Sequence, residues 1–259
     1  MSADSPPGKK HGQPMPSGNA DYQWAQFDSE AYFQHYYGEP HPDDDALVAL
    51  AVEALKKTAS ARADLDVVDI GTGPSLIPFF CALPCARKLT AWEYAECNVA
   101  WLEAELRREP MRPQWRHFWN VARDVYAEVL PDDPMPSLRA KSEVKRGSVF
   151  DLPERRWDLA TMFFCAESIT KRRDEFERAC TAFSHSVKVG GRLIAAFLAR
   201  SPAYVVANKA FPVFGLDTET LREVFAPNTS SLEIRTIGMR EREVRSGYSG
   251  AYFLTGTAR

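Results

Sequence analysis

The spacing of apolar residues along the chain predicts alternating helices and strands. Residues 43–59 have apolar positions at helical spacing, with acidic residues in the first turn and lysines in the last. The apolar run LDVVDI, residues 65–70, predicts a strand, and a helix should begin near Ser75. By the same criteria we expect strands at 87–94, 143–153, 157–168, 192–199, 231–239 and 249–258, and helices at 95–109, 174–191 and 218–225.

Three stretches do not fit this alternation. Residues 110–142 have a weak pattern, and the PDDPMPS segment within them predicts a loop. The aromatic segment 22–42 is too polar and broken for a core helix. Residues 1–20 are rich in Pro, Gly and Ser and lack an apolar core, which predicts a disordered tail rather than a signal peptide. We expect residues 21–259 to form a single domain.

Alternating strands and helices favour an α/β fold with a parallel sheet and helices on both faces. The net charge of −3 argues against nucleic acid as a main partner. No apolar run reaches the about 18 residues that a membrane span needs, so we expect a soluble protein of the cytoplasm. The five cysteines include no C-x-x-C pair, which predicts buried free thiols and no metal site.

The sequence DIGTGPS follows the first predicted strand and offers a ligand-binding turn. Gly71 and Gly73 permit positive φ and the close approach of a ligand at the carboxyl end of a parallel strand. Glu93 lies 22 residues after Gly71, at the end of the next strand, where a carboxylate can accept both ribose hydroxyls of an adenosine. A nicotinamide dinucleotide and S-adenosylmethionine both carry adenosine. Leu76 stands where a pyrophosphate site would place a third glycine, which favours S-adenosylmethionine, although a tight turn without a ligand is an alternative.

Several segments from Tyr22 to the C-terminus resemble one family, the small-molecule N- and S-methyltransferases that include the nicotinamide, phenylethanolamine and thioether enzymes. The resemblance rests on YQWAQFDSEAYFQHYYG, VVDIGTGPS, WEYAECN, SVFDLP, WDLATMFFCAES, KVGGRLI and AYFLTGTAR. It implies a Rossmann-like, seven-stranded, mostly parallel sheet. It also implies an N-terminal helical lid, residues 21–42, that closes over S-adenosylmethionine.

The resemblance also implies which residues contact the cofactor. Tyr32 and Tyr37 match the lid tyrosines that close on its methionine portion. Ser148 stands where many members have an Asp beside the adenine, so Asp151 is a candidate substitute. The full set of implied cofactor contacts is Tyr32, Tyr37, Asp69, Gly71, Thr72, Gly73, Ser75, Glu93, Tyr94, Asn98, Ser148, Val149 and Phe163.

The acceptor is expected beside the end of the fourth strand. The implied acceptor contacts are Tyr32, Phe164, Phe197, Arg200 and Tyr204. Phe197 replaces an Asp of the nicotinamide enzymes, so nicotinamide itself is not expected, and Arg200 would favour an anionic group. Glu167 matches an acid of the phenylethanolamine enzymes that holds an amine or accepts its proton, but a solvated or helix-capping role is an equal alternative.

We therefore expect S-adenosylmethionine-dependent methyl transfer to N, O, S or C of a small, aromatic acceptor from specialised metabolism. A general base is optional because alignment alone can supply several kcal/mol, about 10 at most. The alternatives are an NAD-dependent oxidoreductase and a non-catalytic cofactor-binding protein of the same fold. We expect a monomer or a weak homo-oligomer.

Overall fold

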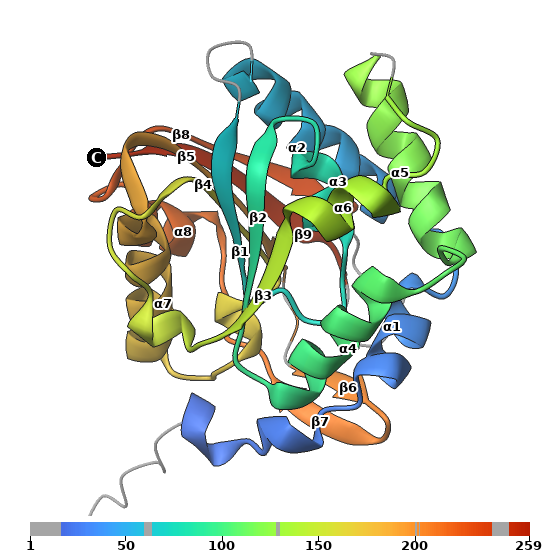
Figure 1. The fold of residues 1–259 in the computed structure, drawn as a ribbon. Coiled ribbons are helices and arrows are strands. Elements are labelled where there is room, and N and C mark those ends of the chain that lie inside the picture. The colour runs from blue at the N-terminus through green and yellow to red at the C-terminus, as the bar shows by residue number, and fades with distance from the viewer. Residues whose placement is uncertain (1–16, 60–63, 128–129, 200, 202, 240–248) are drawn as a thin grey trace, which may run out of the picture.

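The protein is described by a computed structural model that covers residues 17–59, 64–127, 130–199, 201, 203–239 and 249–259. Seven strands form one sheet in the order β3-β2-β1-β4-β5-β9-β8, as Figure 1 shows. Of these strands, β9 runs opposite to the other six, so its pairings with β5 and β8 are antiparallel and all others are parallel. The strands are β1 (Leu65–Ile70), β2 (Ala86–Glu93), β3 (Ser142–Arg146), β4 (Trp157–Phe163), β5 (Val187–Leu198), β8 (Thr229–Ile237) and β9 (Ala251–Ala258). The predicted mostly parallel, Rossmann-like sheet is confirmed.

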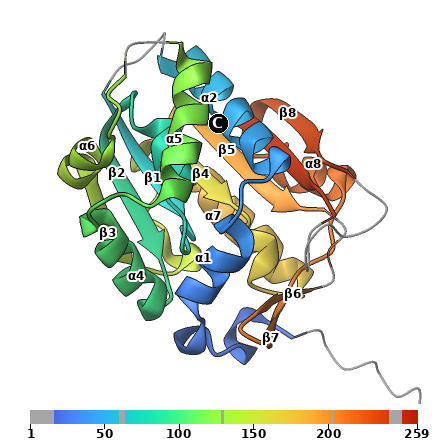
Figure 2. The same ribbon diagram turned by 90° about the vertical axis from the view of Figure 1, so that its right-hand side faces the viewer.

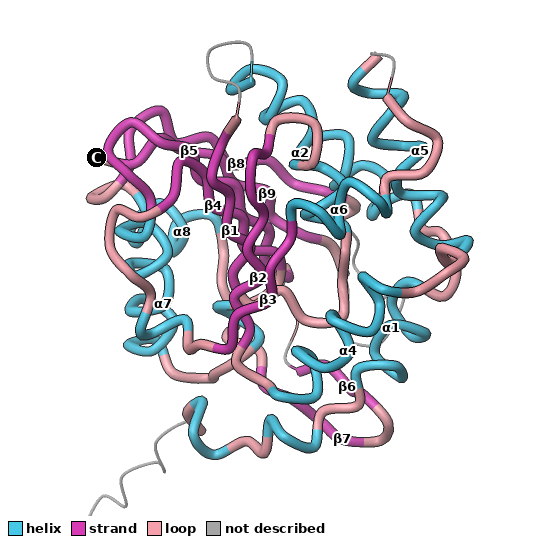
Figure 3. Tube along the Cα trace, viewed as in Figure 1, coloured by secondary structure: helices cyan, strands magenta, loops and turns pink. Residues whose placement is uncertain are grey.

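Helices cover both faces of the sheet, and strand residues alternate between two hydrophobic cores (Figures 1 and 3). Val67 of β1 packs into the core beneath α2 and α3, whereas Val68 packs into the core beneath α7 and α8. This alternation follows from the two-residue period of a strand. The helices are α2 (Pro42–Ala59), α3 (Ile77–Ala82), α4 (Glu96–Arg107), α5 (Pro113–Tyr126), α6 (Met135–Lys141), α7 (Arg173–Ser186) and α8 (Thr218–Phe225).

Residues 110–142 contain two helices, so the weak pattern and the predicted loop were misleading. Helix α5 buries Trp115, Phe118 and Trp119 on one face, while the charged residues between them point away and hide the apolar spacing. Helix α6 starts inside the PDDPMPS segment, where Pro136 lies in the first turn and costs no hydrogen bond.

The predicted helix 174–191 is too long at its C-terminal end. Helix α7 ends at Ser186, and Gly190 and Gly191 lie inside β5 instead of ending the helix. Strand β5 pairs with β4 from Val187 onward, with a register shift between Trp157 and Leu159. Pairing with a neighbouring strand therefore overrides the local glycine signal.

Two segments far apart in sequence form a roof beyond the carboxyl ends of the parallel strands (Figure 2). We use "roof" for residues 17–37 and 203–212. The first part contains two short 3-10 helices and α1 (Ser29–Tyr37), and the second is the hairpin of β6 (Ala203–Val206) and β7 (Lys209–Pro212). Helix α1 buries Phe33, Tyr36 and Tyr37, although its sequence looked too polar for a core helix.

The roof also corrects the expected boundary of the tail. Residues 17–20, assigned to a disordered tail, have a defined place, because the Asn19 N–H donates to Glu175 Oε2 of α7 at 2.7 Å. Residues 1–16 lie outside the described part of the chain.

Candidate active site

The glycine turn after β1 adopts the strained backbone that its sequence predicts. Gly71 has φ +65° and Gly73 has φ +57°, a region that side chains other than glycine rarely occupy. A Cβ on Gly71 would overlap the Cys165 side chain, whereas a Cβ on Gly73 would meet no atom closer than 3.8 Å. Gly71 N–H donates to the Trp92 carbonyl at 2.8 Å, which ties the turn to β2.

Glu93 is held against this turn. Its Oε2 accepts the Gly73 N–H at 2.8 Å, and its Oε1 accepts the Ala95 N–H at 2.7 Å. Burial raises the pKa of the Glu93 carboxyl, and these hydrogen bonds, together with one from the Asn98 side chain, oppose the rise. Each carboxylate oxygen has two lone pairs, so Glu93 can still accept the two hydroxyls of a ribose.

A second buried acid lies beside Glu93. Asp69 accepts a hydrogen bond from the Thr161 hydroxyl, and Thr72 donates to the Asp69 carbonyl at 3.0 Å. Burial raises the pKa of Asp69 to about 7, although its hydrogen bonds favour the ionised form. A cationic ligand in this place would favour the ionised forms of both acids.

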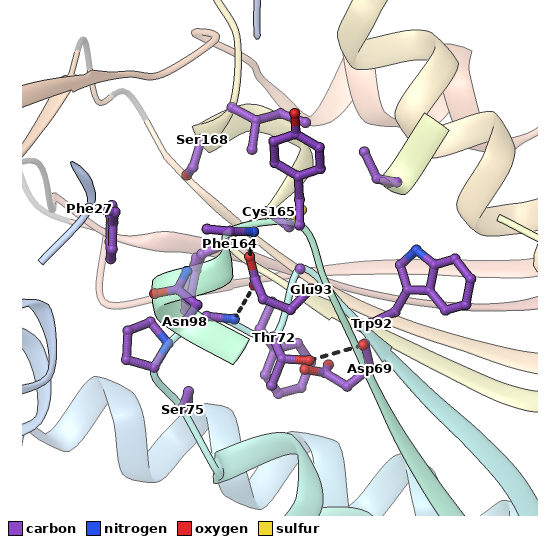
Figure 4. Close-up of a pocket in the computed structure, with 18 of the residues that line it drawn as sticks. Phe27, Asp69, Thr72, Ser75, Trp92, Glu93, Asn98, Phe164, Cys165 and Ser168 are labelled. Atoms are coloured by element: carbon purple, nitrogen blue, oxygen red, sulfur yellow. Dashed lines mark hydrogen bonds between the residues drawn. The ribbon is translucent and has the colours of Figure 1, made fainter. Parts of the chain in front are cut away.

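These groups form one wall of a large cavity, which together with its mouth encloses about 1000 Å³. Figure 4 shows Asp69, Thr72 and Glu93 close together, with Ser168 apart from them. We call this wall, residues 69–75 and 93–98, the floor. The cavity is lined by these residues predicted to contact cofactor or acceptor: Tyr32, Tyr37, Asp69, Gly71, Thr72, Gly73, Ser75, Glu93, Tyr94, Asn98, Ser148, Val149, Phe163, Phe164 and Tyr204.

Aromatic rings close the cavity from the roof side. Trp24 and Phe27 line the cavity, and each contacts Phe211 of the hairpin, with ring centroids 5.5 and 5.0 Å apart. Tyr204 stacks on Phe211 at 5.4 Å and lies edge-on to Tyr32 at 6.4 Å. Phe211 therefore joins the N-terminal part of the roof to the hairpin.

A charged network fixes α1 to the helices behind it. Arg112 forms a two-bond pair with Glu30 of α1, at 2.7 and 2.8 Å, and also donates to the buried Glu105 at 2.8 Å. The hydrogen bonds from Arg112 lower the pKa of Glu30 to about 2. The Arg112 guanidinium also lies over the Phe33 ring, 4.5 Å from its centroid.

One hydrogen bond joins the roof to the floor directly. The Ser29 hydroxyl, at the start of α1, donates to Asn98 Oδ1 at 2.7 Å, and both residues are buried. Because Asn98 also bonds Glu93, the position of the lid helix is coupled to the floor.

A smaller chamber of about 450 Å³ adjoins the large cavity, and the two share Tyr32, Tyr37, Phe164, Ser168 and Tyr204. We call it the side chamber. Tyr36, Asp44 and Leu198 line the side chamber alone. The shared residues mark the place where groups bound in the two cavities can meet.

Two predicted site residues that the structure describes, Phe197 and Glu167, are not found in either lining. Phe197 is fully buried among Phe176 and Phe225 beneath α7 and α8, because its neighbour Leu198 takes the opposite side of β5 and faces the side chamber. The expected contact of Phe197 with the acceptor is therefore wrong. Arg200 lies outside the described residues.

Glu167, the expected catalytic acid, is fully buried and lines neither cavity. Its Oε1 accepts the Leu198 N–H at 2.7 Å, and its Oε2 has no hydrogen-bond partner among the described residues. Burial raises its pKa to about 8, although the Leu198 N–H and the nearby Ser168 hydroxyl oppose the rise. The described geometry fits a protonated acid behind the wall better than the solvated or capping role that was the alternative.

The suggested substitute for the missing adenine-side acid is also wrong. Asp151 is exposed and outside the lining, whereas the preceding Phe150 lines the cavity and lies under the Arg178 guanidinium. The backbone N–H of Asp151 donates to Ser148, and this short turn directs the carboxylate outward.

Sequence reasoning missed several lining residues. These are Asn19, Trp24, Phe27, Tyr36, Asp44, Leu47, Pro74, Ile77, Pro78, Trp92, Ala95, Gly147, Phe150, Cys165, Ser168, Ile169 and Leu198. Trp24, Phe27 and Tyr36 belong to the aromatic segment that was singled out, so the segment was recognised but not the roles of these residues. Asp44 and Ser168 have no motif that could have identified them.

The fold and the site together define a class: a Rossmann-like sheet with a two-glycine turn, a buried acid at the end of the next strand and an aromatic roof over the cavity. A profile of the NNMT/PNMT/TEMT family matches residues 17–256, so the chain belongs to that family. It is an S-adenosylmethionine-dependent methyltransferase, as the sequence predicted.

Individual relatives are distant. Phenylethanolamine N-methyltransferase of Sus scrofa is 24% identical over 236 residues, which cover 82% of this chain and 79% of the relative. Magnesium protoporphyrin IX methyltransferase of Synechocystis, solved with S-adenosylmethionine, has a TM-score of 0.57 at 12% identity and covers 89% and 90% of the two chains. The 1,6-didemethyltoxoflavin-N1-methyltransferase of Burkholderia thailandensis has a TM-score of 0.53 at 14% identity, with 89% and 86% covered.

Among the described residues, neither a metal-binding cluster nor a membrane-spanning helix is present. No group of three or more His, Cys, Asp or Glu side chains in that part of the chain is arranged to hold a metal ion. None of its helices has the length and the apolar character needed to cross a bilayer.

Proposed function

We propose that the protein transfers the methyl group of S-adenosylmethionine to a small aromatic acceptor held in the side chamber. One observation carries the proposal: the large cavity and the side chamber share five residues, and four of them, Tyr32, Tyr37, Phe164 and Tyr204, are aromatic. Aromatic walls favour a flat, apolar acceptor. The smaller volume of the side chamber favours a small one.

The residues of the large cavity fit the cofactor. Gly71 lets the Cys165 side chain pack against the turn, the space beside Gly73 is open, and Glu93 presents its carboxylate for the ribose hydroxyls. Val149 and Phe150 offer an apolar side for the adenine, and Tyr32 and Tyr37 lie on the roof side for the methionine portion. The bound cofactor would supply an electrophilic methyl group on a sulfonium.

The protein's own contribution is alignment and shelter. The roof excludes water from the meeting place, and the aromatic walls hold the acceptor so that its nucleophilic atom lies in line with the methyl group. Burial raises the pKa of Tyr204, so its hydroxyl remains a hydrogen-bond donor at neutral pH. No described lining residue is required as a base, and Glu167 behind the wall is a candidate proton acceptor only in its ionised form.

The proposal also covers the acceptor atom, the metabolic setting, the cellular compartment and the oligomeric state. The acceptor atom is N, O, S or C, and specialised metabolism is the setting that we favour for an aromatic acceptor. The net charge of −3 argues against nucleic acid as a main partner, and we favour a protein of the cytoplasm that acts as a monomer or a weak homo-oligomer. The anionic acceptor suggested by the sequence loses support, since Phe197 faces away and Arg200 lies outside the described residues.

Isothermal titration with S-adenosylmethionine, S-adenosylhomocysteine and NAD tests the proposal, with Glu93→Ala as the variant. Because charged hydrogen bonds contribute about 1.5–3 kcal/mol each, we expect adenosyl affinity to fall at least about tenfold in the variant. Glu103→Ala, an exposed acid on α4, is the matched control and should bind normally. Tighter binding of NAD, or no adenosyl binding by the wild type, would contradict the proposal and favour one of the two alternatives.

A further inference from the structure

The last residue of β5 contributes one side chain to the wall of the side chamber. Aromatic rings form most of the described lining, and Leu198 is the only aliphatic side chain in it. Leu198 is partly buried and does not line the large cavity. A change in the size of this side chain should therefore alter the side chamber and leave the cofactor cavity as it is.

The backbone of Leu198 is held by a side chain where the neighbouring strand ends. Strand β4 pairs with β5 as far as Phe163, opposite Ala196, and the Phe164 N–H donates to the Ala196 carbonyl at 2.8 Å. Two residues further along β5, the Leu198 N–H donates to Glu167 Oε1 at 2.7 Å instead. The Glu167 carboxyl thus extends the hydrogen bonding on the β4 side of β5 beyond the end of β4.

Glu167 is itself fixed in place behind the wall. It is fully buried, and its own carbonyl accepts the Phe214 N–H at 2.7 Å, from the chain that follows the roof hairpin. Burying a carboxyl is costly, so a buried acid is expected to have a task, and the bond to Leu198 is one. Because Glu167 lines neither cavity, it acts on a ligand only through the residues that it holds.

We propose that Leu198 limits the acceptor to a single aromatic ring and that Glu167 is the positioning residue that holds Leu198, an inference that rests on the proposed function. The branched Leu198 side chain occupies space that a second fused ring would need. The side chamber with its mouth encloses about 450 Å³, toward the lower end of the range of about 300–1,000 Å³ for ligand pockets. Glu167 contacts neither the acceptor nor the methyl group.

Two probes, phenol and 2-naphthol, test the size limit, because they carry the same hydroxyl and differ by one fused ring. Their binding to the protein saturated with S-adenosylhomocysteine is measured by NMR titration. A site with room for the second ring would bind 2-naphthol at least about tenfold tighter than phenol, since the ring adds apolar surface. We expect the wild type to bind 2-naphthol no tighter than phenol.

Leu198→Ala should remove the size limit. We expect its affinity for 2-naphthol to rise at least about tenfold over the wild type, with phenol affinity changed by less than about threefold. Phe197→Leu is the matched control, because Phe197 is the neighbour on the same strand and is buried in the opposite core. It should keep the wild-type ratio of the two affinities even if it lowers stability.

Variants of Glu167 test the positioning role. Glu167→Gln keeps an oxygen for the Leu198 N–H and should preserve the wild-type ratio. Glu167→Met and Glu167→Ala remove that oxygen, and in either variant the ratio should shift toward 2-naphthol by at least about threefold. A merely structural role would lower Tm in these variants and leave the ratio unchanged. Thermal unfolding and S-adenosylhomocysteine affinity are measured for every variant.

The outcomes separate this inference from the proposed function. A wild type that fails to bind S-adenosylhomocysteine contradicts the proposed function and the inference with it. If that ligand binds, the inference alone is overturned by a wild type that prefers 2-naphthol about tenfold, by a ratio that Leu198→Ala does not change, or by no binding of phenol. An unchanged ratio in a folded Glu167→Met or Glu167→Ala variant would overturn the role of Glu167.

Discussion

The floor of the cavity is held by backbone hydrogen bonds at strand ends, whereas the roof is held by aromatic rings and an ion-pair network between distant segments. On the floor, Gly71 and Gly73 shape the chain, and Glu93 bonds N–H groups within the same turn region. On the roof, Phe211 joins the hairpin to residues more than 180 positions earlier, and Arg112 anchors α1.

This difference indicates how the two parts should respond to change. A floor made of backbone geometry tolerates almost no added atoms, because the backbone cannot move without breaking the sheet. A roof made of side-chain contacts can lose one contact and remain folded, but its rings are then less well placed over the cavity. Added atoms at a crowded glycine of the floor should therefore mainly destabilise the fold, whereas roof variants should weaken ligand binding in addition to any loss of stability.

The largest effect is expected from Gly71→Ala. The new Cβ would overlap the Cys165 side chain and would be held at positive φ, so we expect a loss of about 3–4 kcal/mol in the free energy of unfolding. Gly73→Ala has comparable backbone strain but open space around it, and should lose only about 1 kcal/mol. Urea unfolding of the two variants checks this. Equal losses would show that steric overlap does not constrain the floor.

Arg112→Met tests the anchor of the roof. It removes the bonds to Glu30 and leaves Glu105 with fewer partners, so we expect a loss of about 2 kcal/mol in unfolding free energy. S-adenosylhomocysteine should also bind more weakly, because Tyr32 and Tyr37 lie on the helix that Arg112 holds. Arg107→Met removes an exposed pair with Glu103 and should change stability by less than about 0.5 kcal/mol.

Ser29→Ala tests the hydrogen bond that joins roof and floor. Loss of its bond to Asn98 should weaken S-adenosylhomocysteine binding by about 1 kcal/mol, roughly fivefold. A double-mutant cycle with Asn98→Ala measures the coupling between the two side chains. Additive effects would mean that the lid and the floor act independently.

The last prediction concerns the pH dependence that the acid behind the wall, Glu167, should cause. Burial raises the pKa of Glu167 to about 8 in the folded protein. The unfolded chain releases this proton above about pH 4.5, whereas the folded protein keeps it until about pH 8. The free energy of unfolding should therefore fall as the pH rises across this interval. Glu167→Gln should therefore gain stability relative to wild type over that interval, measured as the difference in Tm at pH 5 and pH 8. Asp69, whose pKa is about 7, contributes in the same direction in both proteins. The same difference in Tm between the two proteins at pH 5 and at pH 8 would mean that Glu167 does not titrate between these values.

Most of the floor could be predicted from the sequence. Strand β1 has the predicted bounds, and Gly71, Gly73 and Glu93 all lie where the pattern of strand, turn and next strand places them. These features depend on residues close together in sequence or on the fixed geometry of neighbouring parallel strands. The family resemblance also predicted that Tyr32 and Tyr37 belong to the site, and both line the cavity. The spacing of apolar residues alone does not indicate a role for their aromatic segment.

The acceptor side could not be predicted to the same degree. Phe197 and Leu198 are neighbours on one strand, and only their register in β5 decides which of them faces the side chamber. Asp44 is one of three consecutive acids, and the rotation of α2 alone turns it inward. Helix α5 and the β6–β7 hairpin were missed, and both contribute to holding or forming the roof.

The sequence by itself determined the alternating architecture, the two-glycine turn and the position of Glu93 beside it, since local backbone preferences and strand order fix them. Only the tertiary structure decided which side chains face the side chamber, how the roof is anchored and that Glu167 is shielded from both cavities. The physical reason is that the direction and the burial of a side chain depend on the register of its strand or the rotation of its helix. A shift of one residue in register, or a rotation by a fraction of a helical turn, reverses both.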